Sequence, residues 1–499
     1  MNQLKIGAIL SYISIAVNIL TGLLYMPWMI NSIGKENYGL YTLAMSVIGL
    51  FVFDFGLSSA ITRFISKYLA EGKFNKANEC LGLIYRLYFV IDIFLLIIFS
   101  VAFFLIPTIY KELTPSEIST FKNIYVLVSV YSILSFPFIP VNGVLTAHEK
   151  FIQLKICDII HKLLIVGAMT ICLLLGYGLY ALVMVNIIAG LIMIAMKLWS
   201  ITYYTRQKVE IKYYNSLEFK EILNFSGWTT VVSLSQRCIF NIAPTILGAL
   251  SGSTAIAILG VAMTIEGYTY TFSSALSGMF LPKVSRILSS DNSDVLPLMI
   301  RVGRIQLLLV GLITVIFICV GRGFIHLWVG EQFDLSYICS VLIIVPSVIQ
   351  LPQEIGLQAI VAANKVKIQA YVFMVMAVFN VIVSLILAPH LGALGICISV
   401  TLAYIIRTIG LDYILVCHLR INIWRFFKET YLKILLPILL SLLLGLLLVK
   451  FFPVTSWSLL ILDVFFILLN YCLLVYYLSM NNEEKQLVLQ PFVKLIDKF

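Results

Sequence analysis

The sequence predicts an all-α polytopic membrane protein with fourteen transmembrane helices. Hydrophobic residues make up 61% of the 499 positions and charged residues 12%, whereas soluble domains average about 45–50% apolar and about 25% charged residues. Apolar runs of about 20 residues, the length that crosses a bilayer as a helix, recur along the whole chain. A transmembrane barrel would show short alternating segments instead.

Each apolar run is bounded by polar or glycine-marked segments, which places the helices in order along the chain. The predicted spans are about 8–30, 38–60, 83–105, 122–146, 156–175, 177–200, 226–249, 254–280, 303–327, 337–362, 370–388, 392–415, 433–451 and 456–478. The longest predicted outer loop, about 106–121, has no room for a catalytic domain.

The distribution of lysine and arginine predicts the orientation of these spans. With the N-terminus in the cytoplasm, 28 of the 34 basic residues fall in cytoplasmic loops or adjacent helix ends, Arg407 among them. Five fall on the other side, and Arg237 lies within a span. Cytoplasmic loops of membrane proteins carry an excess of lysine and arginine over the loops on the other side. This bias accounts for the net charge of +10, so the charge does not require nucleic-acid binding. Both termini are expected in the cytoplasm.

An internal repeat predicts two similar halves. A single constant shift along the chain superimposes Ile152-Gln153 and Gly176 on Ile368-Gln369 and Gly392. Six spans separate the two copies, so the repeat is parallel about a pseudo-two-fold axis along the membrane normal. The predicted parts are a six-helix bundle over 1–215, a second over 216–432, and two extra helices with a cytoplasmic tail over 433–499.

Two charged residues lie at matching depth in consecutive predicted spans. Arg237 lies eleven positions after Ser226, about 16 Å along a helix and near the middle of a hydrocarbon core about 30 Å thick. Glu266 lies about as deep in the returning helix, and Asn241 shares the face of Arg237. Such residues usually face a bundle interior or a wet cavity. They form either an ion pair between two helices or part of a polar cavity for a substrate or coupling ion.

Two aspartates lie in the predicted spans of the first bundle. Asp54, in the inner half of the second span, is either capped by a neighbouring helix or functional. Asp92 lies near mid-depth in the third span. An isolated buried carboxylate has a raised pKa and can carry a proton, and the alternative is a pair with a cation such as Arg86.

Further polar residues lie at helical spacing in the later spans. Gln350, Glu354 and Gln358 form a stripe on the tenth span beside two prolines. Asp158 and Lys162 are four residues apart and are expected to form a local pair.

Motifs for catalysis and cofactor binding are absent from the sequence. It contains neither a nucleophile–base arrangement, nor a metal-ligand cluster, nor a phosphate-binding glycine motif, and none of its nine cysteines forms a C-x-x-C pair. We therefore expect no cofactor, no metal and no enzymatic activity.

The stretches Ile33–Tyr41 (IGKENYGLY) and Asp54–Leu57 (DFGL), followed by Arg63, resemble the bacterial polysaccharide transporter, or O-antigen flippase-like, family. The region from Ala362–Lys365 to Gly392–Gly395 is similar too. The resemblance implies the fold of the multidrug/oligosaccharidyl-lipid/polysaccharide exporter superfamily, in which two six-helix bundles face a central cavity.

The resemblance also implies a function. Its substrate would be an undecaprenyl-diphosphate-linked oligosaccharide, moved to the outer leaflet of the bacterial cytoplasmic membrane by alternating access, with H⁺ or Na⁺ as the coupling ion. Membrane lipids and other polysaccharide-assembly proteins are the implied partners, and cationic residues are expected in the cavity. Lipid II flippases of the superfamily carry arginines in the first helix; the first span here has none.

The candidate site residues follow from this implied function. A diphosphate needs charge-assisted partners, which would be Arg237 and Asn241 in the cavity and Arg63, Arg86 and Arg304 at its cytoplasmic mouth. The candidates for ion coupling are Glu266, Asp92, Asp54 and Glu354. Two alternatives stay open: a multidrug antiporter, which favours acidic and aromatic cavity groups, and a membrane glycosyltransferase or polymerase, which generally needs a sizeable outer loop.

Overall fold

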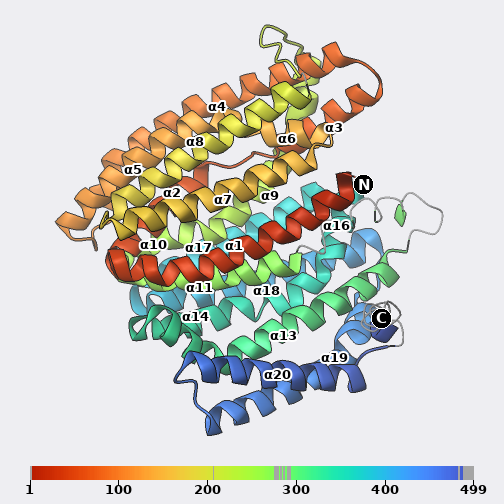
Figure 1. Cartoon of the computed structure of the whole chain (residues 1–499). Helices are drawn as coiled ribbons and strands as arrows, with labels where there is room; N and C mark the ends of the chain where they lie inside the picture. The colour runs from red at the N-terminus through yellow and green to blue at the C-terminus, as the bar shows by residue number, and fades with distance from the viewer. Residues whose placement is uncertain are drawn as a thin grey trace, which may run out of the picture. The chain divides into compact units, whose positions relative to one another are not determined.

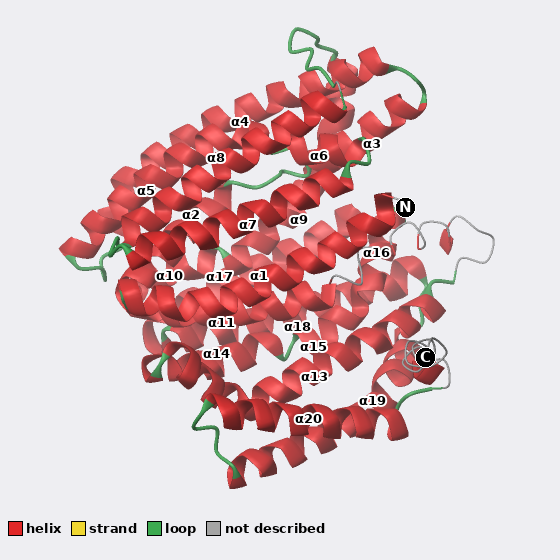
Figure 2. Ribbon diagram, in the orientation of Figure 1, coloured by secondary structure: helices red, strands yellow, loops and turns green. Residues whose placement is uncertain are grey.

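A computed structural model describes residues 3–205, 207–274, 280, 284, 287–288, 294–481 and 484–486. Within these residues the regular structure is helical and no strand occurs (Figure 2). The helices from the N-terminus to Leu250 are α1 (Gln3–Ile33), α2 (Lys35–Phe51), α3 (Leu57–Ala70), α4 (Phe74–Ile109), α5 (Pro115–Ser135), the 3-10 helix η1 (Phe136–Phe138), α6 (Pro140–Ala147), α7 (Phe151–Leu174), α8 (Leu179–Tyr204), α9 (Ser216–Phe240) and α10 (Ile242–Leu250).

The remaining described elements continue the same pattern. They are α11 (Ser253–Ser274), α13 (Leu296–Val329), η3 (Glu331–Phe333), α14 (Asp334–Ile344), α15 (Ser347–Gln350), η4 (Leu351–Gln353), α16 (Glu354–Ala362), α17 (Val366–Leu391), α18 (Ala393–Leu419), α19 (Ile423–Phe451) and α20 (Trp457–Leu478).

Local sequence explains where several helices begin. Thr114 and Glu117 form a capping box at the start of α5, with Pro115 at the first helical position. The side chain of Asn215 accepts hydrogen bonds from the first turn of α9, and that of Ser456 from the first turn of α20.

In the part of the chain that the structure describes, eleven helices are long and apolar enough to cross a membrane, so this is a multi-pass membrane protein. Three predicted spans are not among them. The span at 38–60 is interrupted at 52–56 between α2 and α3, and the span at 226–249 is interrupted at Asn241 between α9 and α10. The span at 254–280 extends beyond α11 into residues outside the described part. The all-α membrane fold is confirmed, and the number fourteen stays a prediction.

The chain forms two compact units, each described here by itself. The first unit comprises Met1–Gly260 and Ala370–Ala403, and the second comprises Val261–Gln369 and Tyr404–Phe499. These boundaries differ from the predicted bundles over 1–215 and 216–432, which rest on the repeat and stay a prediction.

The first unit is built from helices that pack side by side (Figure 1). Helix α7 lies between α1 and α8, α5 contacts α2, α4 and α8, and α3 packs against α6. Helix α2 approaches α10 and the start of α11 so closely that a Cβ at Gly39 would lie 2.2 Å from the carbonyl oxygen of Ser253. A larger residue at position 39 would therefore push these helices apart.

In the second unit, the last two described helices, α19 and α20, pack onto α13. Helices α19 and α20 contact α13 and each other (Figure 1). Their core includes Val315, Cys319, Ile467 and Tyr471, all less than a tenth exposed. The Tyr471 hydroxyl donates to the Leu308 carbonyl at 2.8 Å, which satisfies its only polar atom inside this apolar core.

The bounds of corresponding helices follow the predicted repeat. Helices α17 and α18 begin and end at nearly the same shift from α7 and α8 that superimposes the two copies of the repeat in the sequence. The 3-10 helices η1 and η4, each beside prolines, interrupt the fourth and tenth predicted spans at positions related by nearly the same shift. Proline removes a backbone donor and clashes with the preceding turn, which explains an interruption at these positions.

Candidate functional site

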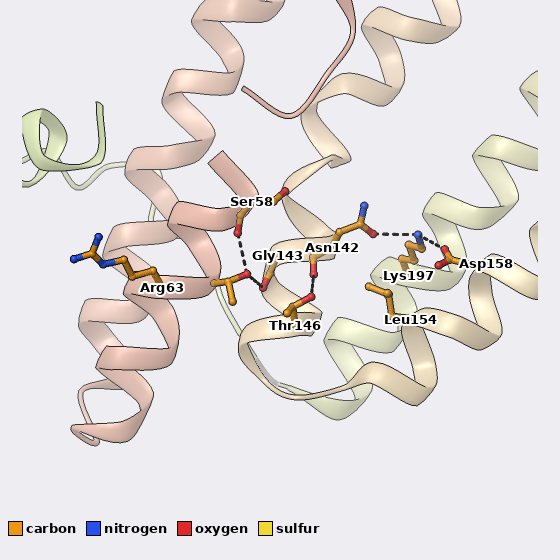
Figure 3. A pocket seen from close by; sticks show the side chains of 9 residues that line it. Ser58, Arg63, Asn142, Gly143, Thr146, Leu154, Asp158 and Lys197 are labelled. Atoms are coloured by element: carbon orange, nitrogen blue, oxygen red, sulfur yellow. Dashed lines mark hydrogen bonds and ion pairs between the residues drawn. The ribbon is translucent and has the colours of Figure 1, made fainter. Parts of the chain in front are cut away.

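A polar pocket of about 530 Å³ opens within the first unit. Its walls come from α3, α6, α7 and α8, as Figure 3 shows. The residues that line it are Ser58, Thr62, Arg63, Asn142, Gly143, Thr146, Leu154, Asp158 and Lys197. Among these nine residues only Leu154 has a large apolar side chain, so the pocket suits a polar ligand.

Lys197 is the buried cation of this pocket, only 6% exposed. Its ammonium donates to the Asn142 amide oxygen at 3.0 Å and to the Asp158 carboxylate at 3.0 Å (Figure 3). A buried charge is costly unless it is paired and hydrogen-bonded. The two acceptors therefore explain how an ammonium is retained between α6, α7 and α8.

The pairing of Asp158 corrects the sequence prediction. Its ion-pair partners are Lys197 at 3.0 Å and Lys155 at 3.8 Å, and not Lys162. Asp158 and Lys197 each lie seven positions inside α7 and α8, about 10 Å from the same end of this antiparallel pair. Matching depth on consecutive helices, the rule applied above to Arg237 and Glu266, was the signal that could have found this pair.

The wall formed by α3 and α6 is held by short polar contacts. The Thr62 hydroxyl donates to the Ser58 carbonyl at 2.9 Å and lies 3.3 Å from the Gly143 carbonyl. A Cβ at Gly143 would lie 2.9 Å from the Ser58 carbonyl oxygen, so glycine permits the close approach of the two helices. The Asp54 carboxylate accepts from the Ser58 amide in the first turn of α3 at 2.9 Å and from the Tyr88 hydroxyl of α4 at 3.0 Å.

Two predicted anion contacts lie away from the buried ammonium. Arg63 is at the rim of the pocket, exposed, with its guanidinium 5.7 Å from the Phe64 ring and directed away from Lys197 in Figure 3. Arg86 donates to the carbonyls of Ile211 at 2.7 Å and Lys212 at 3.1 Å. Arg86 therefore fastens the segment between α8 and α9 onto α4.

Arg237 lies in the last turn of α9, half-buried within the first unit. Its guanidinium donates to the Gly49 carbonyl of α2 and lies 5.3 Å from the centre of the Phe53 ring. Asn241, where α9 gives way to α10, also contacts this point, since a Cβ at Gly49 would lie 2.5 Å from its amide nitrogen. Glu266 is buried in the other unit, so its pairing with Arg237 stays a prediction.

Asp92 lies in α4 and is half-buried. Its Oδ1 atom is shielded from solvent and has no hydrogen-bond partner among the described residues. The predicted alternative, a pair with Arg86, does not occur here, because the Arg86 guanidinium contacts loop carbonyls.

A second buried cation, which sequence reasoning missed, lies in the second unit. Arg407, only 7% exposed, donates to the Gln350 amide oxygen and lies 3.7 Å from the Glu354 carboxylate. The sequence count had assigned Arg407 to the cytoplasmic helix end, but it lies in the middle of α18. Gln353 extends this buried cluster by donating to Asp412 at 3.0 Å.

Arg304 forms its hydrogen bonds with other residues of the chain. Its guanidinium donates to Glu484 at 2.6 and 3.0 Å, to the Ser479 carbonyl at 2.8 Å and to the Glu429 carbonyl at 2.9 Å. The residue is 5% exposed. This arrangement fastens the segment after α20 to α13, a structural position for a residue predicted at the mouth of a cavity.

Residues 4–287 match the model of a family described as polysaccharide biosynthesis protein. The chain belongs to this family. No curated protein matches the sequence. The family assignment confirms the resemblance seen in the stretches around residues 33–63.

Solved structures show which fold this family member has. The lipid II flippase MurJ in an inward closed conformation aligns over 98% of this chain and 100% of its own, with a TM-score of 0.72 and 13% identity. An inward-facing multidrug resistance transporter of the MATE family, in the MOP superfamily, covers 81% and 97%, with a TM-score of 0.64 and 11% identity. A MOP superfamily transporter from Pyrococcus furiosus covers 85% and 96%, with a TM-score of 0.62 and 11% identity.

These neighbours confirm the predicted superfamily fold. They are a flippase and two transporters, and at 11–13% identity they show the fold that this chain shares with them. Within the described residues, no group of three or more histidine, cysteine, aspartate or glutamate side chains is placed to hold a metal ion.

Proposed function

We propose that this family member moves undecaprenyl-diphosphate-linked oligosaccharide units from the cytoplasmic to the outer leaflet by alternating access. The observation that carries the proposal is the buried Lys197 ammonium in a polar pocket of the first unit. The family description and a fold shared with a lipid II flippase support the same substrate class.

The chemistry of the pocket favours a phosphate group. Charge-assisted hydrogen bonds to an ammonium are about twice as strong as neutral ones, and the Asn142 amide and Thr146 hydroxyl add neutral polar groups. A pocket of about 530 Å³ is of the size that holds a small polar ligand. We therefore assign it to the diphosphate headgroup, with the lipid chains and the glycan outside it.

The test compares lysine variants in proteoliposomes with a fluorescent undecaprenyl-diphosphate-linked sugar. Lys197→Met should lower the transport rate about 10–100-fold, the effect of losing one charge-assisted contact, while Lys197→Arg should keep part of it. Lys162→Met is the matched control, because Lys162 lies one turn from Asp158 on α7 outside the lining of the pocket. Transport by Lys197→Met at the rate of the control would contradict the assignment.

The same assay separates the alternative function. A multidrug antiporter should expel cationic dyes in exchange for H⁺ or Na⁺ and leave the lipid-linked sugar in place. Dye efflux without lipid transport would favour that alternative, which the MATE-like fold also admits.

The proposed direction of transport requires the pocket to open towards the cytoplasm of a bacterial inner membrane. The basic residues around it support this placement, since they belong to the predicted cytoplasmic set. A single cysteine at Lys111, in the turn between α4 and α5, should react with a membrane-impermeant maleimide that is added to spheroplasts. Labelling only after lysis would place position 111 in the cytoplasm and contradict the predicted orientation.

A further inference from the structure

Asp158 lies between two lysines and contacts them unequally. Its Oδ1 atom is 3.0 Å from the buried Lys197 ammonium, and its Oδ2 atom is 3.8 Å from the Lys155 ammonium, one turn earlier on α7. The Lys197 side chain is 8% exposed, whereas those of Asp158 and Lys155 are 33% and 32% exposed. The carboxylate thus connects a buried cation to a cation with access to water.

We propose that Asp158 is the resident counter-anion of Lys197 and that an entering diphosphate displaces it onto Lys155. The inference rests on the proposed function and names the residue that governs release of the headgroup. In the structure, Asp158 and Asn142 supply acceptors for the Lys197 ammonium. When phosphate oxygens take the place of Asp158 Oδ1, the carboxylate keeps Lys155 as its partner.

The exchange keeps every buried charge paired. A lysine ammonium left alone in a low-dielectric site would be strongly destabilising, because an unpaired buried charge loses its hydration without compensation. The displaced carboxylate is one-third exposed, so water and Lys155 solvate it after it leaves Lys197. Binding and release then interchange two ion-paired states of the pocket.

A competing carboxylate weakens binding and speeds release. Each diphosphate must break the 3.0 Å Lys197–Asp158 pair before it gains its own contact. A transporter that delivers its substrate to the other leaflet needs such a limit on affinity, because a headgroup held too tightly stays in the pocket. Asp158 is therefore a positioning residue that acts on the substrate through Lys197.

The experiment measures binding and turnover in the purified full chain in detergent and in proteoliposomes. The probes are farnesyl diphosphate and inorganic pyrophosphate, which share the diphosphate and differ in the lipid tail. Asp158→Asn should bind farnesyl diphosphate about 10–100-fold more tightly, as expected when a competing charge-assisted bond is removed, and should turn over more slowly. Tighter binding of both probes by the variant identifies the diphosphate alone as the ligand. Tighter binding of farnesyl diphosphate only means that the lipid tail is also recognised.

Lys155→Met is the second variant, and it leaves the Lys197–Asp158 pair in place. Because the displaced carboxylate then lacks a cation, binding of farnesyl diphosphate should weaken several-fold, while Lys162→Met should bind like the unmodified chain. The inference is overturned if Asp158→Asn binds no more tightly than the unmodified chain, or if Lys155→Met binds equally well. The proposed function fails separately, if Lys197→Met binds the probe as the unmodified chain does.

Discussion

Lys197 in the first unit and Arg407 in the second lie on helices whose bounds are related by the repeat, α8 and α18. Each cation contacts a helical segment next to a 3-10 helix. Lys197 contacts Asn142 of α6, which follows η1. Arg407 contacts Gln350 and Glu354, which lie on either side of η4. Each unit thus places a buried cation against an interrupted helix, in the same order along the chain.

The surroundings of the two cations differ. Lys197 borders a pocket of about 530 Å³, and its carboxylate partner is 33% exposed. The Arg407 and Glu354 side chains are 9% and 7% exposed and pair with each other within the second unit. The same pattern therefore leaves the cation beside a pocket in the first unit and encloses it in a buried cluster in the second.

The largest effect is expected at Arg407. Arg407→Ala should lower the free energy of unfolding by about 3–5 kcal/mol, because it strands the buried Glu354 carboxylate. Arg407→Lys, which keeps the charge, should lose less. Thermal unfolding in detergent measures both, with Lys197→Met as the control whose partner Asp158 stays accessible to water. A greater loss of stability in Lys197→Met would reverse the comparison.

Arg237 tests whether the first unit has a second cation that acts in transport. We expect Arg237→Ala to lower the transport rate about 10-fold, as for one charge-assisted contact, and Arg237→Lys to keep part of the rate because it retains charge without the planar fork. Transport in proteoliposomes is the measurement. The competing ion-pair hypothesis predicts that Arg237→Ala combined with Glu266→Ala recovers transport. Such recovery would make Arg237 a structural partner.

Asp92 is expected to show the smallest effect on stability. In contrast to Glu354, its Oδ1 atom has no hydrogen-bond partner among the described residues, so Asp92→Asn should change the free energy of unfolding by less than about 1 kcal/mol. If Asp92 carries the coupling proton, this variant should transport without response to an imposed pH gradient. Full gradient dependence in Asp92→Asn would remove Asp92 from the coupling step, and a large loss of stability would show an unrecognised structural role.

The sequence by itself determined the fold class and the family. Apolar runs, the distribution of basic residues and the repeat are local or additive properties, and a bilayer requires each span to satisfy its own backbone hydrogen bonds. The stretches around Ile33–Tyr41 and Asp54–Leu57 were sufficient for the family, which the match over residues 4–287 confirms.

The partners of the charged side chains were decided only by the tertiary structure. Sequence gives the depth of a residue along a helix, but the rotation of that helix and the neighbours it meets depend on packing across the whole unit. For this reason Asp158 pairs with Lys197 of α8 and not with Lys162 of its own helix, and Arg407 lies in a buried cluster and not at a helix end. Arg86 and Arg304 were likewise expected to contact a ligand. Instead, Arg86 donates hydrogen bonds to loop carbonyls and Arg304 donates to Glu484.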